Sequence, residues 1–145
     1  MPANGSTARF ARNPRNFDAV ITAALTNLNT DAPSGAVLLV TAGAQGGIVP
    51  RISAILRASL TGGAGIVLFR SATGAVMRPK GSITIPAQNL SNAEALREVD
   101  FVKFNPQRPL YLGPNEQLYV GSMAPPPAGG IIVHGDIIDF IPDPA

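Results

Sequence analysis

Apolar and polar residues alternate along much of this chain, in short segments that turn residues separate. The longest alternating segment spans residues 48–60. From Ile52 onward one parity holds Ile52, Ala54, Leu56, Ala58 and Leu60, and the other holds Arg51, Ser53, Arg57 and Ser59, with Ile55 as the exception. Because side chains alternate between the two faces of a β-strand, the first set is expected in a core and the second in solvent.

The same reading along the chain predicts about eight strands, with Gly or Pro at most of the turns between them. The predicted segments are residues 19–25, 36–41, 48–60, 66–71, 75–87, 98–104, 117–123 and 131–141. Residues 105–116, "NPQRPLYLGPNE", are expected to form a proline-rich connection. Many short strands at roughly regular spacing are typical of an antiparallel sandwich or barrel. We therefore predict an all-β antiparallel β-sandwich of the jelly-roll kind.

Residues 1–16, "MPANGSTARFARNPRN", show no periodicity and are expected to form an extended N-terminal arm. The arm is either a disordered terminus or a segment that orders on a partner. In the second case Phe10 would be its apolar anchor, with Arg9, Arg12 and Arg15 as its charged contacts. Residues 17–145 are then a single sandwich domain. One short helix is expected at residues 91–98, where Ser91 and Glu94 have capping-box spacing.

Composition narrows the function classes. Charged residues make up only 14% of the chain, whereas an ordinary domain has about 25%. Either other protein covers part of the surface, or the exposed faces are rich in Ser, Thr and Gly. Cysteine is absent, which excludes disulfides and thiolate metal sites. No secretory signal is visible, and the apolar runs are shorter than the roughly 20 residues that span a bilayer, so neither secretion nor a membrane partner is expected.

Charge is unevenly placed: three arginines precede Asp18, while Asp136, Asp139 and Asp143 lie near the end. The two ends are expected to attract each other, within one chain or between neighbouring chains. Three arginines are too few for a nucleic-acid surface, which needs a dense basic face.

Residue types that carry chemistry are sparse. His134 is the only histidine and lies within a predicted strand, so it is interpreted as a packing or edge residue. Asp136 and Asp139 are three residues apart on that strand and should face opposite ways, which excludes a shared metal ion. The glycine-rich turns lack the Lys-Ser/Thr of a phosphate loop. We therefore expect no catalysis, metal or cofactor. Without tryptophan, sugar binding would depend on hydrogen bonds from loops.

The segment "APPPAGG", residues 124–130, precedes the last predicted strand. Its prolines Pro125, Pro126 and Pro127 are already restricted in conformation, so docking this loop costs little entropy. The loop is interpreted either as a plain connector or as a contact element at a subunit interface.

Three stretches carry a family resemblance: "LLVTAGAQGGIVPRISAILRAS", "GIVLFRS" and "PLYLGPNEQLYVGS". In these the chain resembles small β-sandwich structural proteins of tailed-bacteriophage virions, of the head decoration, cement or related accessory type. The resemblance spans Leu39 to Val120 and implies no catalytic residue.

The resemblance implies a non-enzymatic virion protein that is assembled in the host cytoplasm. It would bind the major capsid protein or another shell protein, as a homo-oligomer and specifically a trimer. The alternative is a fibre or spike module that binds a host-surface glycan. A small hydrolase that uses His134 is the third reading.

Overall fold

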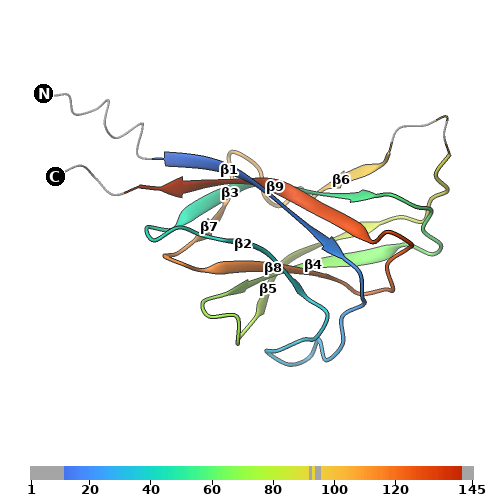
Figure 1. Ribbon diagram of the computed structural model, residues 1–145, viewed down its shortest axis with the longest axis horizontal. Helices are drawn as coiled ribbons and strands as arrows, with labels where there is room; N and C mark the ends of the chain where they lie inside the picture. Colours follow the sequence, from blue (N-terminus) through green and yellow to red (C-terminus); the bar gives the residue numbers. More distant parts are fainter. Residues whose placement is uncertain (1–11, 92, 94–95, 142–145) are drawn as a thin grey trace, which may run out of the picture.

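The computed structural model describes residues 12–91, 93 and 96–141. These residues form nine strands in two antiparallel sheets that face each other (Figure 1). The strands are β1 (Arg12–Ile21), β2 (Val37–Thr41), β3 (Gly47–Leu56), β4 (Ala64–Ser71), β5 (Arg78–Ile85), β6 (Glu98–Asp100), β7 (Leu110–Leu112), β8 (Gln117–Ser122) and β9 (Ile131–Phe140). The predicted all-β sandwich is confirmed.

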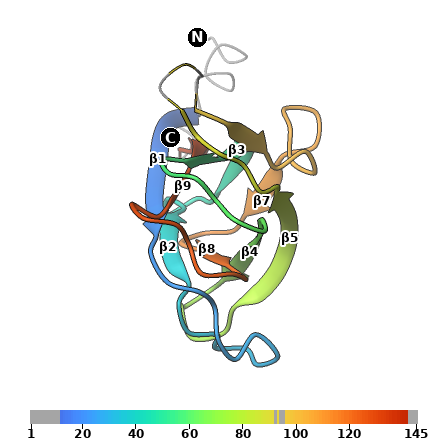
Figure 2. The same cartoon turned by 90° about the vertical axis from the view of Figure 1, so that its right-hand side faces the viewer.

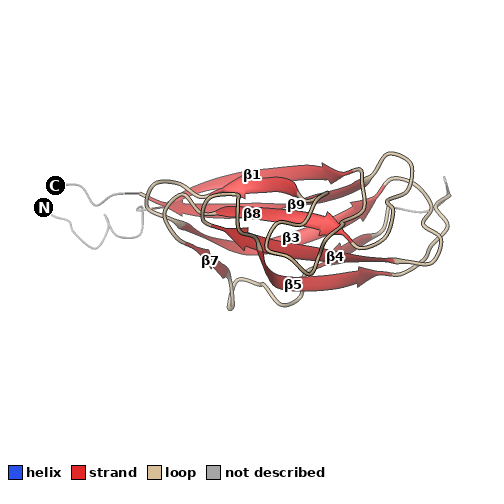
Figure 3. Cartoon of the chain, turned by 90° about the horizontal axis from the view of Figure 1, so that it is seen from below, coloured by secondary structure: helices blue, strands red, loops and turns tan. Residues whose placement is uncertain are grey.

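The strands pair in nested order around the β4–β5 hairpin. β3 pairs with β6 and β7, β2 pairs with β8, and β1 pairs with β9. The first sheet, sheet A, has the order β1-β9-β3-β6 with β7 also on β3, and sheet B has the order β2-β8-β4-β5. Such a wound-up antiparallel hairpin is a jelly roll, as predicted. Figure 2 views the two layers end on, and Figure 3 shows the strands running along the long axis.

Two predicted boundaries are wrong. Residues 12–16, expected in the arm, belong to β1 and pair with residues 136–140 of β9. Pro14 fits there because β1 is an edge strand, where a missing N–H costs no ladder bond. The pairing partner lies more than a hundred residues away, so local composition gives no sign of it. Residues 1–11 lie outside the described residues.

The second wrong boundary is that of the proline-rich connection at residues 105–116, because this segment contains the strand β7. β6 and β7 both pair with β3, at Ser53–Ile55 and at Gly47–Val49 respectively, and so act as two pieces of one interrupted strand. The described residues of the predicted helix at 91–98 are not helical, and Glu98 already begins β6. The prediction of that helix is therefore wrong for the residues that the structure describes.

The core lies between the sheets and confirms the alternation predicted for β3. Ile52, Ala54 and Leu56 are buried against residues of sheet B. Ser53 was expected in solvent but is only 2% exposed. It is covered because β3 lies between β6 and β9, and its hydroxyl donates a 2.6 Å hydrogen bond to Asp100 Oδ1.

The two sheets differ in what covers their outer faces. The connection between β1 and β2 lies over sheet B, where Leu25 N donates to Ser122 O at 2.7 Å and the Leu25 side chain packs on Gly121. Phe69, in the outward row beside Tyr119, is only 1% exposed. By contrast, the outward side chains of sheet A are exposed or half-buried, with Ser53 as the exception. Sheet A therefore presents the freer face.

Gly135, at the centre of β9, allows close packing against β3 and β1. A Cβ there would collide with the carbonyl of Arg51 and lie 2.9 Å from Phe17 Cζ. Gly135→Ala is therefore expected to lower the free energy of unfolding by about 2–3 kcal/mol, measured by urea denaturation. Gly65→Ala is the control, because its Cβ would meet only the flexible Met123 side chain. Equal losses for the two variants would contradict this account.

Candidate functional site

The freer face of sheet A is built by the antiparallel register. We call it the outer face of sheet A, and it comprises Asn16, Asp18 and Val20 of β1, Ile132, His134, Asp136 and Ile138 of β9, Ile48, Arg51, Ser53 and Ile55 of β3, and Glu98 and Asp100 of β6. One row across the strands reads Asp18, His134, Ser53, Asp100. Side chains directly opposite in such a row have Cβ atoms about 4.5–5.5 Å apart.

Two short polar contacts tie the strands of this face together. His134 Nε2 lies 2.6 Å from Glu98 Oε2, so the pair reaches from β9 to β6 across β3. Ser53 donates to Asp100 rather than to His134 and is buried. The side chains here therefore serve as cross-strand contacts in this structure, in line with the interpretation of His134 as a packing or edge residue.

Acid exceeds base on the outer face of sheet A. Among the side chains named above, the carboxylates are those of Asp18, Glu98, Asp100 and Asp136, and the guanidinium is that of Arg51, which lies opposite Asp136 in the register. Among the described residues, no ion pair joins Asp18 or Asp136 to a cation. Since Ile48, Ile55, Ile132 and Ile138 point the same way, the face combines aliphatic side chains with an excess of negative charge.

A second surface carries the opposite charge. It is a groove of about 470 Å³ that we call the basic groove, lined by the cations Arg70, Lys80, Lys103 and Arg108. Its lining residues come from β4, β5, β7 and the segment between β6 and β7, and Figure 2 shows β5 and β7 on the same side of the sandwich. Phe104, Leu110 and Tyr111 supply apolar surface to it.

Few acidic side chains offset the positive charge of the basic groove. Arg70 Nε lies 3.7 Å from Glu116 Oε2, and Lys103 Nζ donates to the carbonyl of Lys80 at 2.7 Å. Lys80 is the extra residue of a β-bulge, because Leu68 pairs with Gly81 and Phe69 with Pro79. Within the described part of the chain, neither Lys80 nor Arg108 has an ion-pair partner. The groove is thus suited to a negatively charged surface.

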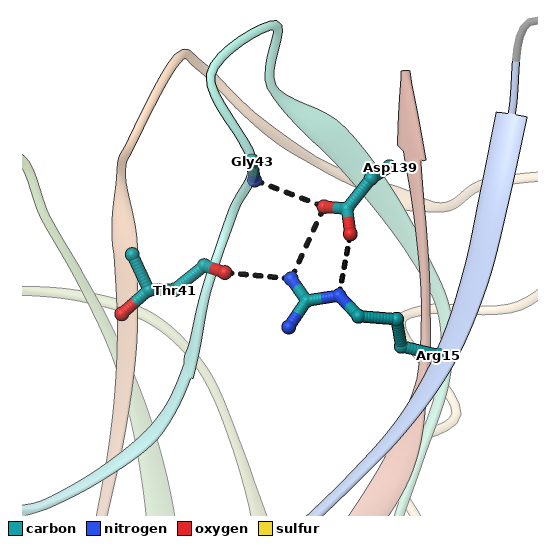
Figure 4. Close-up of polar contacts among 4 residues, drawn as sticks. All are labelled: Arg15, Thr41, Gly43 and Asp139. Atoms are coloured by element: carbon teal, nitrogen blue, oxygen red, sulfur yellow. Dashed lines mark hydrogen bonds and ion pairs between the residues drawn. The ribbon is translucent and has the colours of Figure 1, made fainter. Parts of the chain in front are cut away.

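Arg15, predicted as a partner contact, instead pairs with the buried Asp139 of its own chain (Figure 4). Its Nε lies 2.5 Å from Asp139 Oδ2, and its Nη2 donates to Thr41 O at 2.7 Å and to Asp139 Oδ1 at 3.2 Å. Gly43 N donates to Asp139 Oδ1 at 2.9 Å. The cluster joins β1 and β9 of sheet A to the end of β2 and the turn that follows it. The expected attraction between the two chain ends therefore occurs within one chain.

Asp139 is buried yet charged. Burial by itself would raise the pKa of Asp139, but the hydrogen bonds from Arg15 and Gly43 and the guanidinium charge outweigh it, so the pKa is lowered from its usual value. Asp136, on the same strand, points outward while Asp139 points inward, as predicted. Among the described residues, no group of three or more His, Cys, Asp or Glu side chains is placed to hold a metal ion.

The other predicted contact residues have different positions. Arg9 and Phe10 lie outside the described residues, and Arg12 is described only as the first residue of β1. The proline loop, residues 124–130, joins β8 of sheet B to β9 of sheet A. Pro125 in it is exposed, whereas Pro126 and Pro127 are half-buried.

The ends of the proline loop are braced. Ser122 Oγ donates to Ala124 O at 2.6 Å, Gly130 N donates to Pro127 O at 2.9 Å, and Arg57 Nη2 donates to Gly129 O at 2.5 Å. The loop is thus a connector between the sheets that also presents a stiff apolar surface.

Sequence reasoning missed the basic groove. Its four cations are spread over residues 70–108, and no spacing links them. The alternation in Leu110-Tyr111-Leu112, with Tyr111 exposed between two buried leucines, was the one local sign that a strand borders it.

Comparison with known proteins does not assign this chain: no protein-family model matches it, and a search of curated proteins finds no significant similarity. No helix of membrane-spanning length and hydropathy occurs in the described part of the chain.

The Arg15–Asp139 contact predicts a pH-dependent stability. Because the pKa of Asp139 is lowered by folding, its contribution is fully present above the unfolded pKa of about 3.9 and is lost as pH falls through the folded pKa. Asp139→Asn should lower the free energy of unfolding by about 1–3 kcal/mol at pH 7. Denaturant titrations of both proteins should show this gap narrowing below pH 4.

Asp136→Asn is the matched control on the same strand, and it is expected to change the free energy of unfolding by less than about 0.5 kcal/mol. A gap between wild type and Asp139→Asn that stays constant down to pH 2 would contradict the role assigned to the ionised carboxylate.

Proposed function

We propose that this chain is a structural protein of a tailed-bacteriophage particle, which attaches to the assembled shell and acts through association. The jelly roll supports this reading because viral capsid domains commonly have this architecture. The fold alone does not decide the role, since one fold serves many functions.

The observation that carries the proposal is the outer face of sheet A. An antiparallel sheet with one side in water usually places polar residues on that side. Here four isoleucines, Ile48, Ile55, Ile132 and Ile138, point outward in the sheet. Sheet B has part of its own outer face covered by the β1–β2 connection, whereas sheet A has no such cover among the described residues. An apolar face of this kind favours burial against another subunit.

The low charge content points the same way. Interface cores are depleted of charged residues relative to the remaining surface. With 14% charged residues, the chain has fewer charges to desolvate than an ordinary domain when neighbours pack against it.

The proline loop is the contact that we assign to the shell. Its surface is uncharged and its ends are held by three hydrogen bonds, so docking it orders few additional groups. Rigid contact elements bind more tightly because less conformational entropy is lost on association.

The test is co-sedimentation of the purified chain with empty tailed-phage heads. Replacing all three prolines, Pro125→Gly, Pro126→Gly and Pro127→Gly, should weaken attachment about tenfold, because each proline removed adds conformational freedom that docking must restrict. Thr61→Gly, in another exposed turn, is the control and should bind like the wild type.

Absence of the wild-type chain from heads at saturating concentration would contradict the proposed function. Binding to a glycan array instead of heads would favour the fibre or spike alternative. Retention of full head binding by the triple variant would overturn the role of the loop.

A further inference from the structure

We propose that the basic groove of one copy receives the outer face of sheet A of a second copy. This contact would be the interface by which the protein self-associates, and the inference rests on the proposed function in so far as that function requires oligomers. Each surface is the partner of the other, because their charges are complementary.

The acidic partner contributes Asp18 and Asp136, which form no ion pair among the described residues, although Arg51 lies opposite Asp136 in the register. Asp18, on β1, is exposed, and Asp136, on β9, is half-buried. Glu98 and Asp100 add negative charge at the β6 edge, where each already has one polar partner, His134 or Ser53. Cations from a neighbour would reduce the excess of carboxylates over Arg51 among the side chains named for this face.

The basic partner contributes cations that likewise form no ion pair among the described residues. Lys80 and Arg108 line the groove without an ion-pair partner among the described residues. They cannot reach Asp18 in the same molecule by the sheet order, because β1 is at the far edge of sheet A from the β6–β7 side. Like charges gathered in one concave surface raise its potential, which favours an oppositely charged partner.

Apolar side chains beside the groove match the isoleucines of the opposing face. Val102 is 79% exposed and Tyr111 is 64% exposed, and both line the groove. Their burial against Ile132 and Ile138 would supply the favourable free energy of association. The charge pairs around them would set the register and exclude wrong partners.

The two surfaces are different patches of one molecule, adjoining near Asp100 and Val102, so the contact is heterologous. A heterologous contact repeats from copy to copy and forms a closed ring where the rotation closes.

The experiment reverses charge on each surface and then on both. Lys80→Glu with Arg108→Glu changes the groove, and Asp18→Lys with Asp136→Lys changes the face. Each double variant is expected to associate about a hundredfold more weakly than the wild type and to sediment as a monomer of 15.0 kDa. The quadruple variant has complementary surfaces again, and it should recover the oligomeric mass of the wild type.

Arg78→Glu with Arg97→Glu is the control, since it changes the net charge by the same amount as the groove variant at exposed positions outside both surfaces and away from the proline loop. It should sediment as the wild type does. Circular dichroism and thermal melting establish that every variant is folded before its mass is measured. Three results would overturn the proposal: a wild type that is monomeric at about 100 µM, double variants that are oligomeric, or a folded quadruple variant that stays monomeric. The concentration is on the order of the Kd of a weak interface.

The head-binding assay separates this inference from the proposed function. If the wild type is monomeric yet sediments with heads, the self-association is wrong and the shell role stands. If the charge-swap series behaves as expected but no variant binds heads, the interface stands and the shell role is wrong.

Discussion

The pairing of β1 with β9 is the interaction on which the other features depend. Ten residue pairs, from Arg12 with Phe140 to Ile21 with Ile131, join the two ends of the described chain. This ladder closes the jelly roll at its outermost turn and places Phe17 against Gly135. It also brings Arg15 beside Asp139, and the ion pair then links sheet A to the end of β2. Without the β1–β9 pairing, β9 would be a sheet edge and the outer face of sheet A would lose Asp18 and Val20.

The charged residues fall into two groups. Arg15 and Asp139 stabilise the fold, whereas those of the outer face of sheet A and the basic groove are available to partners. Arg15 and Asp139 pair with each other, with the carboxylate buried and the guanidinium 41% exposed, and removing Arg15 would leave the buried carboxylate without its counter-charge. On the outer face of sheet A and in the basic groove, by contrast, charges of one sign gather at the surface. Such unbalanced surfaces favour association with partners of opposite charge over internal stability. Arg15 therefore belongs to folding, and Asp18, Asp136, Lys80 and Arg108 belong to the proposed interface.

The uneven cover of the two sheets explains why sheet A, not sheet B, carries the candidate site. The β1–β2 connection packs Leu25 on Gly121, and Phe69 on the outward side of sheet B is buried, so part of the apolar surface on the outside of sheet B is already covered. The connections beside sheet A leave its isoleucines half-buried. Both the shell contact assigned to the proline loop and the self-association assigned to the charged surfaces are proposals that build on this difference.

By itself the sequence determined the strand-rich class and most strand positions, because a period of two is a local property that survives in any sheet. The inward set Ile52, Ala54 and Leu56 and the opposed directions of Asp136 and Asp139 follow from it. Tertiary structure alone decided that residues 12–16 extend β1, that Leu110–Leu112 form β7 and that Ser53 is buried. It also decided that Arg15 meets Asp139 and that four cations from residues 70–108 converge in one groove. The physical reason is the same throughout: these features arise between strands that are far apart along the chain, and only the nested pairing of the jelly roll sets which strands become neighbours.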